Sequence, residues 1–147
     1  MSESDEKYEA SPWEWVRNQV DEYEASAGQA GNTLMDTGMA IIILRTTGAK
    51  SGLLRKTPLM RVEHEGEYAL IGSLGGAPKN PVWVYNLRAN PNAAVQDGAE
   101  PFEVTVREVD GDERAAWWER AVAAYPPYAE YQQKTERKIP VFVATRA

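Results

Sequence analysis

The spacing of apolar and polar positions changes several times along this 147-residue chain. Near the N-terminus the apolar positions lie three and four residues apart, which predicts a helix with one apolar face. These positions are Trp13, Val16, Val20, Tyr23 and Ala27. Ser11, Pro12 and Glu14 match a capping box, at N-cap, N1 and N3, so we expect the helix to begin there.

Short apolar runs follow this helix, and such runs are typical of buried strands. We expect strands over 39–46, over 53–64, over 67–73, around Val95, over 102–109 and over 139–145. The first three are predicted to form a meander, with Glu65-Gly66 as the turn between the second and the third. Asp97-Gly98 is predicted to join the fourth and fifth strands.

Three further helices are expected between and after these strands. Asn80-Pro81 predicts the start of a short helix, with Asn80 as N-cap and Pro81 at N1. Asp110, with Glu113 three residues later, predicts the cap of a longer one. Tyr125-Pro126-Pro127 ends that helix, and a new helical turn follows. This order of elements favours a mainly β fold, a mostly antiparallel small barrel with flanking helices, over a doubly wound sheet.

The net charge of −6 lies entirely within the first 30 residues, which hold eight acids and two bases. Residues 37–62 and 68–96 contain no Asp or Glu but seven Lys or Arg. A pI near 4.9 argues against nucleic-acid binding, which requires a broad basic face. A small anionic ligand suits a local basic region better.

The chain has no cysteine and a single histidine, His64, between two glutamates. Thiol chemistry is therefore excluded, and no metal site or Ser-His-Asp triad is predicted. No apolar run approaches the ~20 residues that span a bilayer, and the N-terminus lacks the pattern of a signal peptide. We expect a cytoplasmic protein.

We divide the chain into an acidic tail and amphipathic helix, residues 1–30, and a barrel domain, residues 31–147. The helix is expected to pack on the barrel or on a second subunit, which would make a homodimer. Contact with the inner face of a membrane is the alternative, although an acidic helix is repelled by anionic lipid.

Three segments could carry chemistry. Thr46 to Pro58 is a glycine-punctuated basic turn that could cradle a phosphate or carboxylate, or be a solvated hairpin loop. Ser73 to Pro81 is glycine-rich and precedes a helix N-terminus, where an anion or a polar ring edge could bind, or it is an ordinary connection. Tyr125, Tyr128 and Tyr131 could form the wall of a flat pocket, or pack as core. Tyr128 and Tyr131 are expected to share a helical face.

Together, these segments resemble the deazaflavin-dependent nitroreductase family, whose members use reduced coenzyme F420. The resemblance covers roughly residues 35–145. It rests on Thr-Thr-Gly-x-Lys-Ser-Gly-x-x-Arg at 46–55, Gly-Gly-Ala-Pro-Lys-Asn-Pro-x-Trp at 75–83, Asn86-Leu87 with Ala89-Asn90-Pro91, and Tyr-Pro-x-Tyr-x-x-Tyr at 125–131.

The resemblance implies a split β-barrel, like that of FMN-binding flavin reductases. It also implies a groove for coenzyme F420, whose phosphodiester and glutamate tail are anionic. The implied cofactor-binding residues are Lys50, Ser51, Arg55, Lys56, Pro58, Ser73, Leu74, Gly75, Gly76, Ala77, Lys79, Asn80, Pro81 and Trp83. The implied catalytic residues, as proton donors or substrate contacts, are Ser73, Tyr125, Tyr128 and Tyr131.

Met60 stands where well-studied relatives place a tyrosine, so the substrate pocket, which the three tyrosines share, is expected to be more apolar and flexible. The function implied is hydride transfer from reduced F420 to a planar acceptor such as a quinone or nitroaromatic. Two alternatives stay open, a non-catalytic deazaflavin or flavin carrier and an FMN-dependent reductase on the same barrel.

Overall fold

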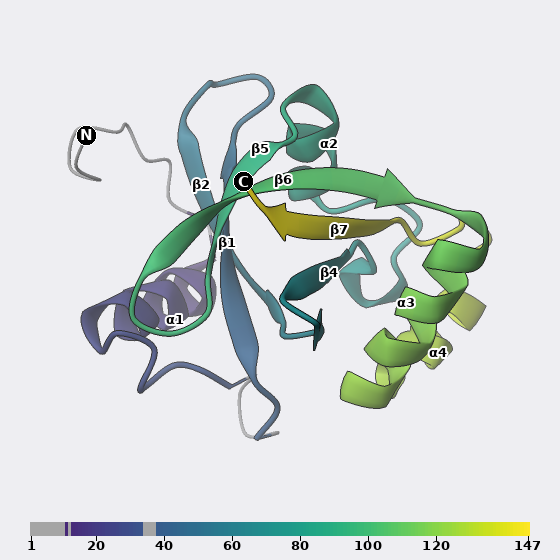
Figure 1. Cartoon of the computed structure of the whole chain (residues 1–147), viewed down its shortest axis with the longest axis horizontal. Coiled ribbons are helices and arrows are strands. Elements are labelled where there is room, and N and C mark those ends of the chain that lie inside the picture. Colours follow the sequence, from purple (N-terminus) through teal and green to yellow (C-terminus); the bar gives the residue numbers. More distant parts are fainter. Residues whose placement is uncertain (1–10, 12, 34–37) are drawn as a thin grey trace.

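The computed structural model describes residues 11, 13–33 and 38–147, and within them seven strands form one sheet. The strands are β1 (Ile41–Thr47), β2 (Leu54–Met60), β3 (Glu63–His64), β4 (Glu67–Ile71), β5 (Asn92–Gln96), β6 (Pro101–Val109) and β7 (Val141–Arg146). Their order is β2-β1-β5-β6-β7-β4-β3, and every neighbouring pair is antiparallel. The sheet curls into a half-barrel (Figure 1), which confirms the predicted antiparallel barrel.

In the described part of the chain, four α-helices flank the sheet: α1 (Glu14–Ala25), α2 (Val82–Ala89), α3 (Gly111–Ala124) and α4 (Pro127–Lys134). In Figure 1, α1 lies beside β1 and β2 at one end of the molecule, and the α3–α4 pair lies at the other. None of the described helices is long and apolar enough to cross a membrane.

Both faces of the sheet are covered, so the central strands are apolar at successive positions. Ile41 and Ile43 pack in one buried cluster with side chains of α1, α3 and α4. Ile42 and Leu44 point to the opposite face and pack in a second cluster with side chains of α2. The alternation of side chains along a strand thus divides one apolar run between two cores.

The predicted meander is wrong. The segment expected as one strand over 53–64 divides into β2 and β3, which lie at opposite edges of the sheet. The edge of β1 that faces away from β2 is occupied by β5, so the β3–β4 hairpin pairs instead with β7. Its turn is formed as predicted, with Glu65 and Gly66 at φ 53° and 85°.

Two of the predicted helix starts are also wrong. The N-cap of α1 is Trp13, and Ser11 Oγ accepts a hydrogen bond from Trp13 N over 3.2 Å; Pro12 lies outside the described residues. The N-cap of α2 is Pro81, and Asn80 Oδ1 instead accepts a hydrogen bond from Arg137. Asp110 does stand at the N-cap of α3, although its side chain forms no capping hydrogen bond.

Helix α1 is fixed to the barrel by polar contacts as well as by its apolar face. The Tyr23 hydroxyl donates to Gln96 O over 3.2 Å and accepts from Gly98 N over 2.7 Å. Glu24 forms ion pairs of 2.7 and 2.8 Å with Arg45 and Lys56. The boundary at residue 30 stays a prediction, and α1 contributes buried side chains to the core of the barrel.

Candidate functional site

The basic turn is the connection of the β1–β2 hairpin. Gly48 N donates to Leu53 O over 2.8 Å, and Gly52 N donates to Gly48 O over 2.9 Å. Leu53 N donates to Ser51 Oγ over 3.1 Å, and Gly52 has a φ of +70° that favours glycine. The amides of Gly48, Gly52 and Leu53 are therefore engaged within the turn itself.

Asn86 of α2 anchors this turn. Its side chain is only 3% exposed. Its Oδ1 accepts a hydrogen bond from Ala49 N over 2.9 Å, and its Nδ2 donates to Thr46 Oγ1 over 3.2 Å. The sequence identified Asn86 only as part of a motif, and the structure shows that it fixes the hairpin turn to α2.

Arg55 and Lys56, adjacent in sequence, lie on opposite faces of β2. In the β1–β2 register, Arg55 lies opposite Thr46, on the face toward α2. Lys56 lies opposite Arg45, on the face toward α1. Lys56 is 7% exposed, and its Nζ is bound by Glu24. The structure thus places Lys56 on the face opposite Arg55, together with the predicted cofactor-binding residue Pro58, which lies opposite Ile43 of β1.

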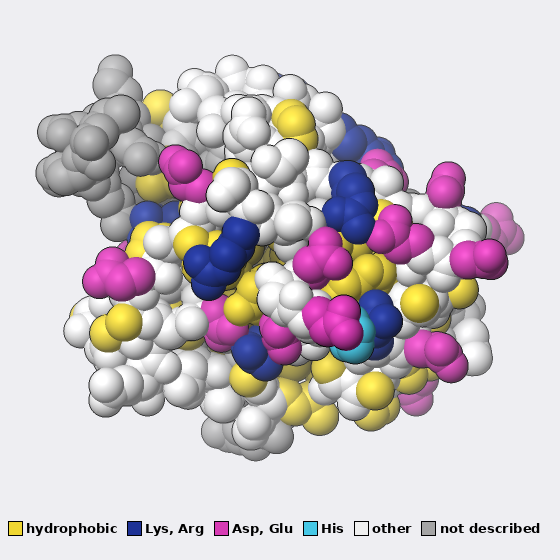
Figure 2. All heavy atoms as spheres, viewed as in Figure 1, with side chains coloured by type: hydrophobic (Ala, Val, Ile, Leu, Met, Phe, Trp, Pro, Cys, Tyr) yellow, Lys and Arg dark blue, Asp and Glu magenta, His cyan; other side chains and the backbone are white. Residues whose placement is uncertain are grey.

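Several other Lys and Arg side chains of residues 37–62 and 68–96, which contain no Asp or Glu, form ion pairs with acids from other parts of the chain. Arg45 pairs with Glu24, Arg61 with Asp97 and Arg88 with Glu108, each at 2.7 to 2.9 Å. On the face shown in Figure 2, Lys and Arg lie among Asp and Glu and form no broad basic field. Lys50 and Lys79 are exposed and have no ion pair with any described residue.

The glycine-rich segment forms a short 3₁₀ turn, η2 (Leu74–Gly76). Because the resemblance predicts that this segment binds the cofactor, we call residues 72–80 the cofactor loop. Arg137, which the sequence analysis did not single out, donates four hydrogen bonds to this loop. The acceptors, at 2.7 to 3.1 Å, are Gly72 O, Ser73 O, Ala77 O and Asn80 Oδ1. Burial lowers the pKa of Arg137.

The cofactor loop also packs against α4. A Cβ added at Gly76 would lie 3.0 Å from Tyr131 O and 3.1 Å from Lys134 Cβ, so glycine permits the contact between loop and helix. Leu74 is exposed and has a φ of 46°. Ser73 is buried, whereas the predicted groove residue Trp83 packs inside the barrel with its ring 5.8 Å from that of Phe142.

The three tyrosines come together at the junction of α3 and α4. Their ring centroids are 4.9 to 6.2 Å apart, and the hydroxyls of Tyr125 and Tyr131 lie within hydrogen-bond distance at 2.9 Å. Burial, with the hydrogen bond to Tyr131, raises the pKa of Tyr125 to about 12. Burial raises the pKa of Tyr128 well above its ordinary value. Met60 belongs to the same buried cluster as Tyr128.

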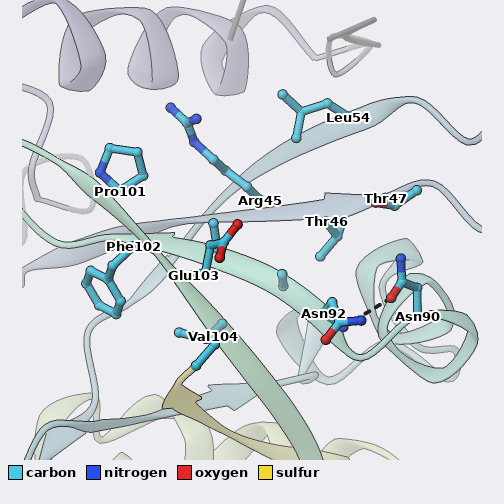
Figure 3. Close-up of a pocket in the computed structure, with 13 residues that line it drawn as sticks. Arg45, Thr46, Thr47, Leu54, Asn90, Asn92, Pro101, Phe102, Glu103 and Val104 are labelled. Carbon is cyan, nitrogen blue, oxygen red and sulfur yellow. Dashed lines mark hydrogen bonds between the residues drawn. The ribbon is translucent and has the colours of Figure 1, made fainter. Parts of the chain in front are cut away.

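A hollow of about 480 Å³ lies elsewhere and is lined by residues of β1, β2, β5 and β6. Figure 3 shows Arg45 and Leu54 on one side of it and Phe102 and Val104 on the other. The residues that line it include none of the predicted site residues. Its one cation, Arg45, is already bound by Glu24, so this hollow does not suit a polyanionic ligand.

Comparison with known proteins decides the family. The profile of the F420H(2)-dependent quinone reductase family matches residues 15–146. The chain belongs to this family. Its cofactor is therefore coenzyme F420, and the predicted enzyme class, an F420H2-dependent reductase, is confirmed.

Individual relatives agree with the family assignment. An F420H(2)-dependent quinone reductase of Mycobacterium tuberculosis is 34% identical over 127 residues, 84% of this chain and 85% of the relative. The solved structure of an F420-H2 dependent reductase is 56% identical, covers 71% of this chain and 92% of its own, and has a TM-score of 0.67. A structure described as a domain-swapped dimer is 50% identical, covers 91% of this chain and 99% of its own, and has a TM-score of 0.70.

The split-barrel fold is confirmed as well. A heme binding protein from Mycobacterium smegmatis is 17% identical, with a TM-score of 0.56 over 84% of this chain and 49% of its own, and this likeness concerns the fold alone.

The residues present fit the cofactor that the family implies. A ligand with a phosphodiester and a glutamate tail needs cations and charge-assisted donors, and the exposed amines of Lys50 and Lys79 provide them together with Arg55. A planar ring needs aromatic surface and hydroxyls beside it, and the three tyrosines supply both, although their ring planes are inclined by 53° to 77° to one another and form no single flat wall. Among the described residues no group of three or more His, Cys, Asp or Glu could hold a metal ion.

Proposed function

We propose that this enzyme reduces a quinone by accepting a hydride from reduced coenzyme F420, and that nitroaromatic compounds are secondary acceptors. The observation that supports this proposal best is the contact between Gly76 and Tyr131. It brings the loop expected to hold the cofactor ring against the helix expected to line the acceptor pocket.

The proposal gives each segment a role. Lys50, Arg55 and Lys79 bind the phosphate and the acidic tail by charge-assisted hydrogen bonds. The backbone of the cofactor loop orients the ring system. The bound cofactor supplies the hydride, from its C5 carbon, and the protein supplies alignment, exclusion of water and a proton.

The acceptor side is formed by Met60 and the three tyrosines. Tyr128 and Met60 are buried and provide an apolar wall. The Tyr125 hydroxyl is protonated at neutral pH, as that of any tyrosine is, so it can donate a hydrogen bond or a proton to a developing anion on the acceptor. Ser73 Oγ, at the edge of the cofactor loop, is the second candidate for this donor.

An activity assay tests the proposal directly. Purified protein is mixed with reduced F420 and a water-soluble menaquinone analogue, and the absorbance of the oxidised coenzyme is followed. We expect oxidation that depends on both protein and acceptor. Binding of F420 without such oxidation would support a carrier, and a much tighter affinity for FMN than for F420 would support an FMN-dependent reductase.

The acceptor and the assembly are parts of the same proposal. A nitroaromatic compound in place of the quinone is expected to be reduced more slowly. Because a relative is described as a domain-swapped dimer, we propose that this chain also forms homodimers, which light scattering coupled to size-exclusion chromatography measures. A monomeric mass at micromolar concentration would contradict the dimer.

We also propose peripheral contact of a cytoplasmic enzyme with the inner membrane face, where quinones dissolve. Trp13 and Trp15 at the start of α1 are 57% and 43% exposed, and tryptophan favours the membrane interface. Flotation with neutral and anionic vesicles tests this contact. We expect weak binding to neutral vesicles and less to anionic ones, since α1 is acidic.

A further inference from the structure

Arg137 differs from most of the other partnered arginines in what it binds. Arg45, Arg61, Arg88 and Arg107 each pair with a carboxylate. The guanidinium of Arg137 instead donates only to carbonyl-type oxygens, and among the described residues it has no carboxylate partner. It is a half-buried cation used as a multidentate clamp on one loop.

The clamp determines which way the peptide groups of the loop face. Gly72 O and Ser73 O both point at Arg137, over 3.1 and 2.8 Å. In a trans peptide the N–H lies opposite the carbonyl, so the amides of Ser73 and Leu74 point away from the guanidinium. Neither amide donates a hydrogen bond to a described residue.

The loop conformation needs such a clamp because it is not an intrinsically favoured one. Leu74 has a φ of 46° and Gly76 a φ of 84°, and a left-handed conformation is unfavourable for leucine. Among the described residues, the other hydrogen bonds of η2 run from Gly76 N to Ser73 O and from Ala77 N to Leu74 O. Arg137 binds carbonyls on both sides of this turn.

Arg137 is itself fixed by the tyrosine helix. Gln132 of α4 donates from Nε2 to Arg137 O over 2.8 Å and accepts at Oε1 from Ile139 N over 3.0 Å. The same helix carries Tyr128 and Tyr131. One chain of contacts therefore runs from α4 through Gln132 and Arg137 to the cofactor loop.

We infer that Arg137 is a positioning residue, which orients the amides of Ser73 and Leu74 toward the cofactor ring and holds the cofactor loop in register with α4. The inference rests on the proposed function. It assigns Asn80 a supporting role as an acceptor of Arg137, in place of the helix cap that the sequence predicts.

Two variants separate geometry from charge. Arg137→Ala removes both the planar set of guanidinium donors and the positive charge. Arg137→Lys keeps the charge but cannot reach four acceptors. We expect the dissociation constant for F420 to rise at least tenfold in both variants, and guanidinium ion added to Arg137→Ala to restore much of the affinity. An unchanged dissociation constant for F420 in Arg137→Lys would overturn the claim that the planar guanidinium is required.

Arg114→Ala is the matched control. Arg114 is also half-buried, donates to a backbone carbonyl, that of Ile139 over 2.7 Å, and has a pKa lowered by burial. We expect it to lose thermal stability without a change in F420 affinity. An equal loss of affinity in Arg114→Ala would reduce the effect of Arg137 to general destabilisation.

Hydrogen exchange of the cofactor-free protein gives a readout independent of the proposed function. We expect Arg137→Ala to accelerate exchange at the amides of Gly76 and Ala77 more than in the strands. Unchanged exchange there, or faster exchange with unchanged F420 affinity, would overturn the inference. Failure of the wild-type protein to bind F420 would instead contradict the proposed function. The supporting role of Asn80 is tested by the double variant Arg137→Ala/Asn80→Ala, and an F420 affinity lower than that of Arg137→Ala alone would contradict it.

Discussion

The hydroxyls of Tyr125 and Tyr131 lie 2.9 Å apart, across the break between α3 and α4. Tyr125 is the C-cap of α3, with φ −146° and ψ 88°, and α4 begins at Pro127. The change of chain direction between them folds the Tyr125 ring back over α4. The two proline residues thus complete a tyrosine cluster that a single continuous helix would not form.

Removal of one hydroxyl from this pair is expected to lower stability and to change turnover. Tyr125→Phe leaves Tyr131 without its partner, which costs about 0.5–1.5 kcal/mol of unfolding free energy in urea titration. Turnover of the quinone is expected to fall while F420 affinity stays the same. Tyr85→Phe is the control, because Tyr85 is exposed on α2. Equal stability and kinetics in both variants would make the Tyr125 hydroxyl dispensable.

Because the pKa of Tyr125 is raised, the free energy of unfolding is expected to fall with rising pH in the alkaline range. An unperturbed tyrosine has a pKa of 10.0, and burial raises that of Tyr125 to about 12. Between these values the folded state retains a proton that the unfolded state releases, so a rise in pH favours unfolding. Stability that is complete below pH 10 is therefore lost as the pH approaches 12. Urea titrations at several pH values should show a shallower decline in Tyr125→Phe.

Loss of either cation at the hairpin should weaken cofactor binding. Lys50→Ala and Arg55→Ala each remove a charge-assisted donor, and we expect a loss of about 1.5–3 kcal/mol in F420 binding free energy. The loss should shrink at high salt, which screens these charges. Arg88→Ala, whose side chain pairs with Glu108, is the control. Undiminished affinity in both hairpin variants would remove this anion site from the proposal.

Two glycines with nearly the same φ angle should respond differently to alanine. Gly66 and Gly76 have φ values of 85° and 84°, so the conformational cost of about 1–2 kcal/mol is shared. An added Cβ meets nothing within 4 Å at Gly66, whereas at Gly76 it meets Tyr131 O at 3.0 Å. We expect Gly76→Ala to lose a further ~1–3 kcal/mol. Equal melting temperatures would show that the loop and α4 are not in close contact.

Glu24 is expected to be the most sensitive acid of α1. It binds both Arg45 and Lys56, which are 12% and 6% exposed. Glu24→Gln removes the negative charge that both cations contact, and we expect a loss of about 1–3 kcal/mol of unfolding free energy. Glu14→Gln, in the first turn of the same helix, is the control. A difference below measurement error would show that solvent or other contacts compensate the cations.

Much of the site was predictable because its parts are local. Glycines, cations and tyrosines stand in short motifs, and the motifs resemble one family in the right order. The side-chain contacts between residues far apart in sequence were not predictable. Lys56 follows Arg55 directly, and only the position of α1 shows that Glu24 binds one of them. Arg137 occurs in a short polar connection without a motif, since its partners are carbonyl oxygens, which every residue carries.

The sequence by itself determined the alternation of strands and helices, the antiparallel barrel and the chemical character of each site segment. These depend on local periodicity, turn residues and charge, which act over a few positions. Only the tertiary structure decided which edge each strand pairs with, which face each cation occupies and how the cofactor loop is held against α4. These depend on contacts between residues far apart in sequence, such as Arg137 and Gly72, and no local pattern encodes them.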